Sequence, residues 1–346
     1  MKKSTIVAIL TLVAGLILIA VGFAIVRGDF KKLNGKYSDK YTEYTYKCSG
    51  NITSIDVSEL SENVYVSVGD VEFPVIEYWI QDKYEDTVKI KEENGKLKFE
   101  RDHKNIGWNF SFFNIAFEDT STRLTIPASF KGEMSIGASS GSVYLDGIEL
   151  DEKLTAKASS GYVTVKNSSA KELFAKANSG SIKLTNLKIS GDVNIQNTSG
   201  YLTAEDIVAG GDLSAENSSG YLKLVGIRAE EVSAKNTSGG MILEKVEAKE
   251  VSASDSSGHL KLESVNADKI EAKNTSGGIS LKDISADAIT LKCSSGSVSG
   301  YISGSEEDYS IISNTGSGSS NLKDSRNGDK TLDVTTSSGS ISIKFR

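Results

Sequence analysis

Apolar and polar residues alternate over short stretches through most of this chain, and the pattern restarts about every twenty residues. In 250–258 (EVSASDSSG), for example, polar side chains separate Val251 from Ala253. An apolar residue at every second position is typical of a β-strand with one buried face, whereas the 3.6-residue period of a helix is absent. The pattern predicts an all-β protein.

A Ser-Gly pair marks the repeat, because its glycines follow one another at intervals of 19 or 20 residues. They are Gly141, Gly161, Gly180, Gly200, Gly220, Gly239, Gly258, Gly277 and Gly296. A Thr-Gly pair at Gly316 and a Ser-Gly pair at Gly339 continue the series less regularly. Such a period is typical of a solenoid, and glycine suits a corner with positive φ. We therefore expect a single-chain β-solenoid with one coil per repeat.

Three pairs of apolar positions recur in each repeat at fixed distances from the glycine. In one repeat these pairs are Val251 and Ala253, Leu260 and Leu262, and Val265 and Ala267. We interpret them as three short strands around one interior, which predicts a roughly three-sided prism. The regular coils are expected over 136–346. The less even strand-like runs of 47–135 predict an irregular N-terminal part of the same solenoid.

One inward position, three residues before the glycine, is polar in five consecutive repeats. Its residues are Asn197, Asn217, Asn236, Asp255 and Asn274. Stacked amides can hydrogen-bond from rung to rung, as they do in cross-β ladders. We expect this column to be a structural ladder.

The N-terminus carries an uncharged, mostly apolar segment at 6–26, after Lys2 and Lys3. It is long enough to cross a bilayer as a helix. A cleaved signal peptide is the alternative, but no obvious small-x-small cleavage site precedes Arg27. We expect a cytoplasmic tail at 1–5, a transmembrane signal-anchor at 6–26 and a tether at 27–46. The rest would face outward from the cell membrane as part of a single-pass protein.

Charge and cysteine content narrow the possible functions. The chain has 39 Lys and Arg against 46 Asp and Glu, a net charge of -7, so it lacks the basic field typical of nucleic-acid binding. Cys48 and Cys293 have no thiol nearby in sequence, which favours free thiols over a disulfide. His103 and His259 lack the spacing of a metal site or a catalytic partner. We expect no catalytic, cofactor-binding or metal site, and no enzyme.

Two sets of outward residues are candidates for surface contact. Tyr162, Tyr201 and Tyr221 follow the glycine in three repeats, where they can stack on sugars or, for the last two, on each other. Lysines such as Lys235 and Lys273 precede the glycine by four residues. They form either a solvated face or a surface for an anionic wall polymer. The aromatic stretch 108–113 would plug the end of the stack or contact a membrane or ligand.

The segments 123–127 (RLTIP) and 134–143 (MSIGASSGSV) resemble the signature of a bacterial β-strand-repeat family called "putative adhesin" domains, of unknown function. The chain is similar, over about 50–346, to the extracytoplasmic part of LiaG-type membrane-anchored proteins, which occur beside envelope-stress systems. The resemblance implies the fold and an envelope location, but it transfers no catalytic or ligand residues.

We therefore expect a non-enzymatic, adhesin-like envelope module that binds a wall polymer or a partner protein. A structural spacer or envelope-stress scaffold without a ligand is the alternative. A polysaccharide-active β-helix enzyme is a more distant one. The oligomeric state does not follow from the sequence.

Overall fold

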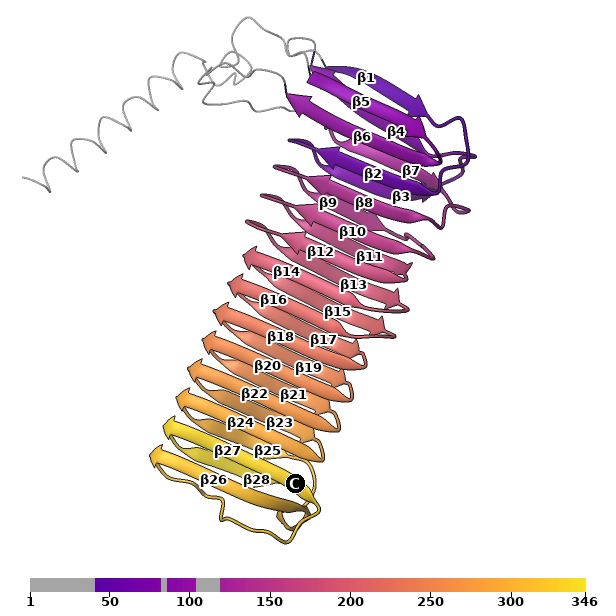
Figure 1. Cartoon of the computed structure of the whole chain (residues 1–346). Coiled ribbons are helices and arrows are strands. Elements are labelled where there is room, and N and C mark those ends of the chain that lie inside the picture. The colour runs from indigo at the N-terminus through magenta and orange to yellow at the C-terminus, as the bar shows by residue number, and fades with distance from the viewer. Residues whose placement is uncertain (1–40, 82–85, 104–118) are drawn as a thin grey trace, which may run out of the picture. The chain divides into compact units, whose positions relative to one another are not determined.

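The computed structural model describes residues 41–81, 86–103 and 119–346. They belong mainly to one compact unit, made of Glu43–Trp79, Thr87–Asp102 and Thr120–Arg346. The rest of the chain forms a second unit, of which only strand ends are described. The large unit consists of two sheets of stacked strands, here called sheet A and sheet B (Figure 1).

Sheet A contains, in spatial order, β1 (Tyr41–Lys47), β4 (Val75–Gln81), β7 (Thr122–Pro127), β3 (Val64–Gly69), β9 (Val143–Asp146), β11 (Val163–Ala170), β13 (Ile182–Ile189), β15 (Leu202–Ala209), β17 (Leu222–Arg228), β19 (Met241–Glu247), β21 (Leu260–Asn266), β23 (Ile279–Ser285), β25 (Val298–Ile302) and β28 (Ile341–Phe345). Each regular coil contributes one of these strands.

Sheet B contains, in spatial order, β5 (Asp86–Glu93), β6 (Lys96–His103), β2 (Ser54–Glu59), β8 (Glu133–Ala138), β10 (Lys153–Ala158), β12 (Glu172–Ala177), β14 (Val193–Ser199), β16 (Leu213–Ser219), β18 (Glu231–Ser238), β20 (Glu250–Ser257), β22 (Lys269–Ser276), β24 (Ala288–Ser295), β27 (Lys330–Ser338) and β26 (Tyr309–Ser317). A single 3₁₀ turn, η2 (Glu306–Asp308), precedes β26.

Consecutive coils pair in parallel and in register, which confirms the predicted β-solenoid. Leu260 pairs with Ile279 across β21 and β23, and Val251 pairs with Ile270 across β20 and β22. All four side chains are buried between the two sheets. Because each repeat places the same apolar positions inward, neighbouring coils cover one another's faces and build one continuous core.

The predicted three-sided prism is wrong, because each regular coil has two strands. The third apolar pair of a repeat, such as Leu187 and Ile189, continues strand β13. Asn186 interrupts that strand with a φ of 53°, and pairing with β15 resumes at Leu187. The left-handed residue inserts one extra residue into the strand, as a bulge does. The inward side chains therefore change from even-numbered positions, Ile182 and Leu184, to odd-numbered ones, Leu187 and Ile189. The equivalents of Asn186 in other coils are Asn167, Asp206, Gly226, Lys245, Ser264 and Asp283.

The last coils are not stacked in sequence order. The sequence places Gly316 between Gly296 and Gly339, but a Cβ on Gly339 would lie 2.1 Å from the Gly296 carbonyl oxygen. Strand β27 therefore lies directly on β24, and β26 lies beyond it at the end of the stack (Figure 1). Along the chain, the outermost strand β26 thus comes before β27, which lies between β26 and β24.

The segment after β26 covers the final strand edges. Ser325 forms an antiparallel bridge with Ile311, and Ser320 forms a parallel bridge with Ile341. The Asn321 side chain bonds both the amide nitrogen of Ile343, at 2.9 Å, and its carbonyl oxygen, at 2.6 Å. These bonds satisfy edge groups that would otherwise be open to pairing with another chain.

Several predictions concern residues outside the described ranges. These are the tail at 1–5, the signal-anchor at 6–26, residues 27–40 of the tether and the aromatic stretch 108–113. The end of the predicted tether, 41–46, belongs to β1 instead. Within 41–81, 86–103 and 119–346, no helix has the length and apolar character needed to cross a membrane.

Candidate functional site

The predicted polar ladder occupies one inward column of sheet B. In register this column runs through Glu59, Ala138, Ala158, Ala177, Asn197, Asn217, Asn236, Asp255, Asn274, Cys293 and Thr336. All of these side chains are buried. Within the described ranges, no amide-to-amide hydrogen bond joins its asparagines. Instead, Asn217 Nδ2 donates to the Gly200 carbonyl oxygen at 3.3 Å, and Asn274 Nδ2 donates to that of Gly258 at 2.9 Å. Asn217, Asn236 and Asn274 thus fasten their coils to the preceding corner, whereas the side chains of Asn197 and Asp255 make no such bond.

The corner changes where the column changes from alanine to asparagine. The corner glycines with φ values between 113° and 154° are Gly200, Gly220, Gly239, Gly258, Gly277, Gly296 and Gly339, whereas Gly141, Gly161 and Gly180 lie outside the positive-φ region. The predicted corner at Gly316 is displaced, because Gly318 stacks on Gly339. The amide of Gly200 donates forward to the Ser219 carbonyl, at 2.9 Å. The residue three positions before the glycine is therefore a sequence signal for the corner geometry.

Asp255 is the one carboxylate among the five ladder residues and is 2% exposed. Burial raises its pKa, and the backbone amides of Ser257 and Ser256 and the charge of His259 oppose the rise. A carboxyl whose pKa is raised by folding stabilises the protein at pH values below its unfolded pKa. That contribution is lost as the pH rises through the folded pKa.

We therefore expect Asp255→Asn to raise the free energy of unfolding at pH 7 by about 1–2 kcal/mol, because asparagine can bond the corner without a buried charge. The gain should vanish below about pH 3, where aspartic acid is protonated in both states. Urea unfolding at several pH values measures it, with the exposed Asp268→Asn as the matched control. An equal change in both variants at pH 7 would contradict this interpretation.

A buried ion pair, which the sequence analysis missed, lies in the same column at its N-terminal end. Arg101 Nε lies 3.0 Å from Glu59 Oε2, with both side chains at most 2% exposed. Thr122 also donates to Glu59, and Arg101 Nη1 donates to the Trp79 carbonyl oxygen at 2.9 Å. The pair thereby joins β2, β6, β4 and β7. Burial raises the pKa of Glu59 even though Arg101 opposes the rise.

The two cysteines are free, as predicted, and both are buried. Burial raises the pKa of the Cys48 thiol to about 12 and also raises that of Cys293. Thiols that stay protonated are poor nucleophiles, so both positions serve packing.

The predicted tyrosines lie on the outer side of sheet A. We use the name tyrosine face for the outward residues at the first and third positions after each corner glycine. It includes the residues of β3 and β7 that pair in register with them. Tyr162 is 56% exposed and Tyr201 is 66% exposed. Two further tyrosines, Tyr65 and Tyr144, lie on the same face. They are register partners whose rings stack with centroids 4.7 Å apart. The face thus carries five tyrosines, counting Tyr221.

The tyrosine face continues at its N-terminal end with a cation and an indole. Arg123 in β7 is the register partner of Tyr65, and its guanidinium lies 5.2 Å from the centre of the Trp79 ring. Cation–π contacts of this kind orient both groups. Strands β7, β3 and β9 supply the row Arg123, Tyr65 and Tyr144, and Glu77 of β4 is the register partner of Arg123 at the end of this row. Sequence reasoning missed this row because these strands are not consecutive along the chain.

Tyr221 packs on the next coil and is not stacked with Tyr201. A Cβ on Gly240 would lie 2.4 Å from Tyr221 Cε2, so the ring covers this glycine. In a similar way, a Cβ on Gly278 would lie 3.5 Å from the His259 ring. The Nε2 of His259 is 2.8 Å from Ser280 Oγ. Of the aromatic pairs among the described residues, none joins Tyr201 to Tyr221. Tyr201 therefore keeps its ring open to solvent.

The family profile called Toastrack DUF4097 matches this chain twice, at residues 52–207 and 190–345. The chain belongs to the Toastrack DUF4097 family. The match covers the whole stack of coils and confirms the resemblance to a β-repeat family of unknown function. No protein with a curated description matches the chain.

Three solved structures that match over most of the chain come from Parabacteroides and Bacteroides. A "putative adhesin" from Parabacteroides merdae ATCC 43184 is 11% identical, covers 89% of this chain and 97% of its own, and gives a TM-score of 0.40. A "putative adhesin" from Bacteroides fragilis NCTC 9343 is 16% identical, covers 89% and 98%, and gives 0.30. A "putative lipid binding protein" from Parabacteroides distasonis ATCC 8503 is 16% identical, covers 89% and 98%, and gives 0.40.

The predicted lysines lie on the other sheet of this Toastrack chain. Lys235 in β18 is 3.3 Å from Glu216, and Lys273 in β22 is 2.6 Å from Glu271. Both are on the outer side of sheet B and in ion pairs, so the structure does not bring them together with the tyrosines.

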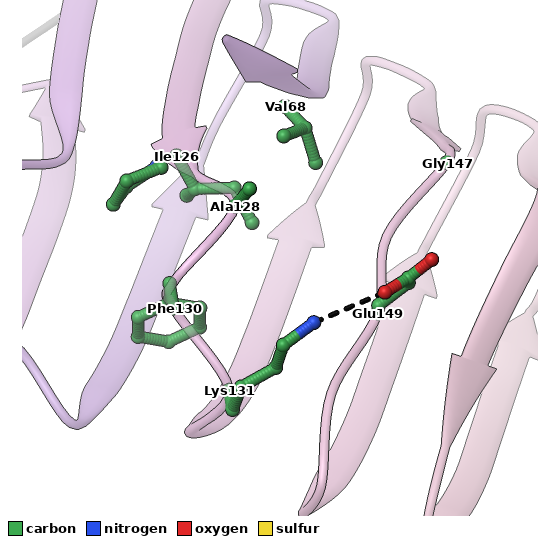
Figure 2. Close-up of a pocket in the computed structure, with 8 residues that line it drawn as sticks. Val68, Ile126, Ala128, Phe130, Lys131, Gly147 and Glu149 are labelled. Atoms are coloured by element: carbon green, nitrogen blue, oxygen red, sulfur yellow. Dashed lines mark hydrogen bonds and ion pairs between the residues drawn. The ribbon is translucent and has the colours of Figure 1, made fainter. Parts of the chain in front are cut away.

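A small cavity of about 130 Å³ opens where β3 and β7 end (Figure 2). Apolar side chains, among them Val68, Ile126 and Phe130, line it, and Lys131 forms an ion pair of 3.1 Å with Glu149 beside it. These are the two charged side chains that line the cavity, and they are paired with each other. Within the described ranges, no group of three or more His, Cys, Asp or Glu residues is placed to hold a metal ion.

Proposed function

We propose that this chain is a non-enzymatic, adhesin-like module of the cell envelope that binds a surface polymer through the tyrosine face. The observation that carries the proposal is the concentration of five tyrosines on one side of one sheet, with Tyr162 and Tyr201 more than half exposed. Aromatic rings offer a flat apolar surface on which the apolar faces of sugar rings can stack. A row of such rings along a stack of coils suits a linear chain of sugars.

The envelope location in this proposal rests on the apolar segment 6–26, which is long enough to anchor the chain in a membrane. The non-enzymatic role is supported by the mixed, ion-paired character of the outer surfaces. A spacer without a ligand is the competing function. It predicts that the tyrosine face binds nothing.

Binding to isolated cell-wall polymers distinguishes these functions. The full chain, purified in detergent, is mixed with insoluble wall material, and bound protein is measured by sedimentation. We expect saturable binding that the double variant Tyr162→Ser/Tyr201→Ser weakens about tenfold, since each stacked ring contributes about 0.5–1.5 kcal/mol. Phe174→Ser, on the outer side of sheet B, is the matched control and should bind as the parent does.

The absence of saturable binding to any wall polymer would support the spacer. Unchanged binding by the tyrosine double variant, with its thermal unfolding also unchanged, would move the site away from the tyrosine face. Turnover of a glycan by the full chain would contradict the non-enzymatic role.

A further inference from the structure

The charges of the tyrosine face are of one sign over most of its length, and the row meets an acid only at Glu77 in β4, the register partner of Arg123. From β7 to β28, its two columns contain Arg123, Lys183, Lys223 and Lys261 but no Asp or Glu. The whole chain, in contrast, has a net charge of -7. Acidic residues of sheet A first appear two positions further along each strand, where they include Asp146, Glu205, Glu244 and Glu263. Anionic groups are thus kept off the strip that carries the tyrosines.

The lysines of the tyrosine face differ in whether they form an ion pair. Lys223 lies 3.7 Å from Glu205, and Lys261 lies 2.6 Å from Glu263. Lys183 is exposed and has no ion-pair partner in the described part of the chain. It lies in β13, the strand between β11 and β15, and its register partners are Thr164 and Thr203, each two residues along the strand from Tyr162 or Tyr201. An exposed cation one column away from two exposed rings favours a ligand that carries a negative charge beside its apolar surfaces.

The corner beside the tyrosine face adds hydroxyl groups. The two residues before each corner glycine are almost all serine or threonine, and they are exposed in the regular coils, as Thr198 and Ser199 are. Rungs are about 4.8 Å apart, so these hydroxyls form two rows parallel to the tyrosines. Hydroxyl groups can donate to phosphate or carboxylate oxygens and accept from sugar hydroxyls.

We propose that the tyrosine face binds an anionic sugar polymer, a chain of hydroxylated units that bears phosphate or carboxylate groups and lies along the stack. The inference rests on the proposed function and names its ligand class. Tyr162 and Tyr201 stack on the units, Lys183 in the neighbouring column pairs with a charge beside them, and the corner hydroxyls bond the remaining oxygens. Single-stranded nucleic acid also combines stacking with negative charge, but it requires a continuous basic groove. Here tyrosine, threonine and serine separate the cations.

The experiment compares four polymers on the full chain in detergent: a wall polymer of sugar rings joined by phosphodiesters, polygalacturonate, neutral hydroxyethyl cellulose and oligo-dT. We expect both anionic sugar polymers to bind about tenfold more tightly than the other two, and to bind more weakly as salt rises. Lys183→Ser should weaken their binding about fivefold. Lys188→Ser, an exposed lysine of the same strand on the far side of the bend, should change it less than twofold.

The outcomes separate the inference from the proposed function. If the neutral polymer binds as tightly as the anionic ones and the tyrosine double variant weakens it, the inference is overturned and the function stands. If no polymer binds, both fail. Equal binding of oligo-dT, or equal effects of Lys183→Ser and Lys188→Ser, would also overturn the inference.

Discussion

Replacing Gly258 with alanine is expected to lower the free energy of unfolding by about 4 kcal/mol, a loss at the upper end for a single substitution. Gly258 has a φ of 143°, and an added Cβ would lie 1.6 Å from the Gly239 carbonyl oxygen. The neighbouring backbone has little freedom to move, because Gly239 is packed in the same way against Gly220. The new methyl group therefore clashes with a backbone atom and strains its own residue.

Gly147→Ala is the matched control. Gly147 also has a positive φ, of 69°, but nothing lies within 4 Å of an added Cβ. Its cost should be limited to the conformational strain, about 1 kcal/mol. Chemical unfolding followed by circular dichroism compares the two variants. Similar losses in both would show that the corner glycines are needed for their backbone angles alone, and not for close stacking.

Arg101→Met is expected to lower the free energy of unfolding by about 3–5 kcal/mol, because it leaves the Glu59 carboxylate buried without its cation. Burial already raises the pKa of Glu59, so the native state holds its proton more tightly than the unfolded state does. Stability from this group is present at low pH and is lost as the pH rises through the folded pKa. Loss of Arg101 raises that pKa further, and the defect should therefore shrink toward acidic pH.

The double variant Glu59→Leu/Arg101→Met tests the same pair from the other side. Replacing both charges with apolar groups of similar size should recover most of the stability lost in the single variant. Urea unfolding of the parent, both single variants and the double variant completes the cycle. Additive losses would mean that the two side chains do not depend on each other.

The stack of coils was predictable because each repeat carries its own alternation and its own corner. The inward columns at Leu260 and Val251 follow from local spacing alone. The bend in sheet A was missed because its left-handed residue has no fixed identity: it is Asn186 in one coil, Lys245 in another and Gly226 in a third. A signal was present in the sequence: Leu184 and Leu187 are three residues apart, so both can point inward only if the alternation is interrupted between them.

The order of the terminal coils could not be predicted from the repeat pattern. It depends on which strand edges pair after the last regular repeat. That β27 lies between β24 and β26 has no local signature. The candidate site was predicted in part for the same reason. Tyr162 and Tyr201 were found from their place in the repeat, whereas Tyr65 and Arg123 join them only through long-range pairing.

The claim on which the columns and the tyrosine face both depend is that one repeat makes one coil. Ser214 and Ser233 are register partners on adjacent strands, and Ser233 pairs in turn with Ser252. Adjacent strands lie about 4.8 Å apart, within the Cα separation of a disulfide, while two rungs span about 9.6 Å and exceed it. After oxidation and digestion, mass spectrometry of the full chain should detect a disulfide in Ser214→Cys/Ser233→Cys. The same disulfide should be absent from Ser214→Cys/Ser252→Cys, and the opposite result would contradict the coil assignment.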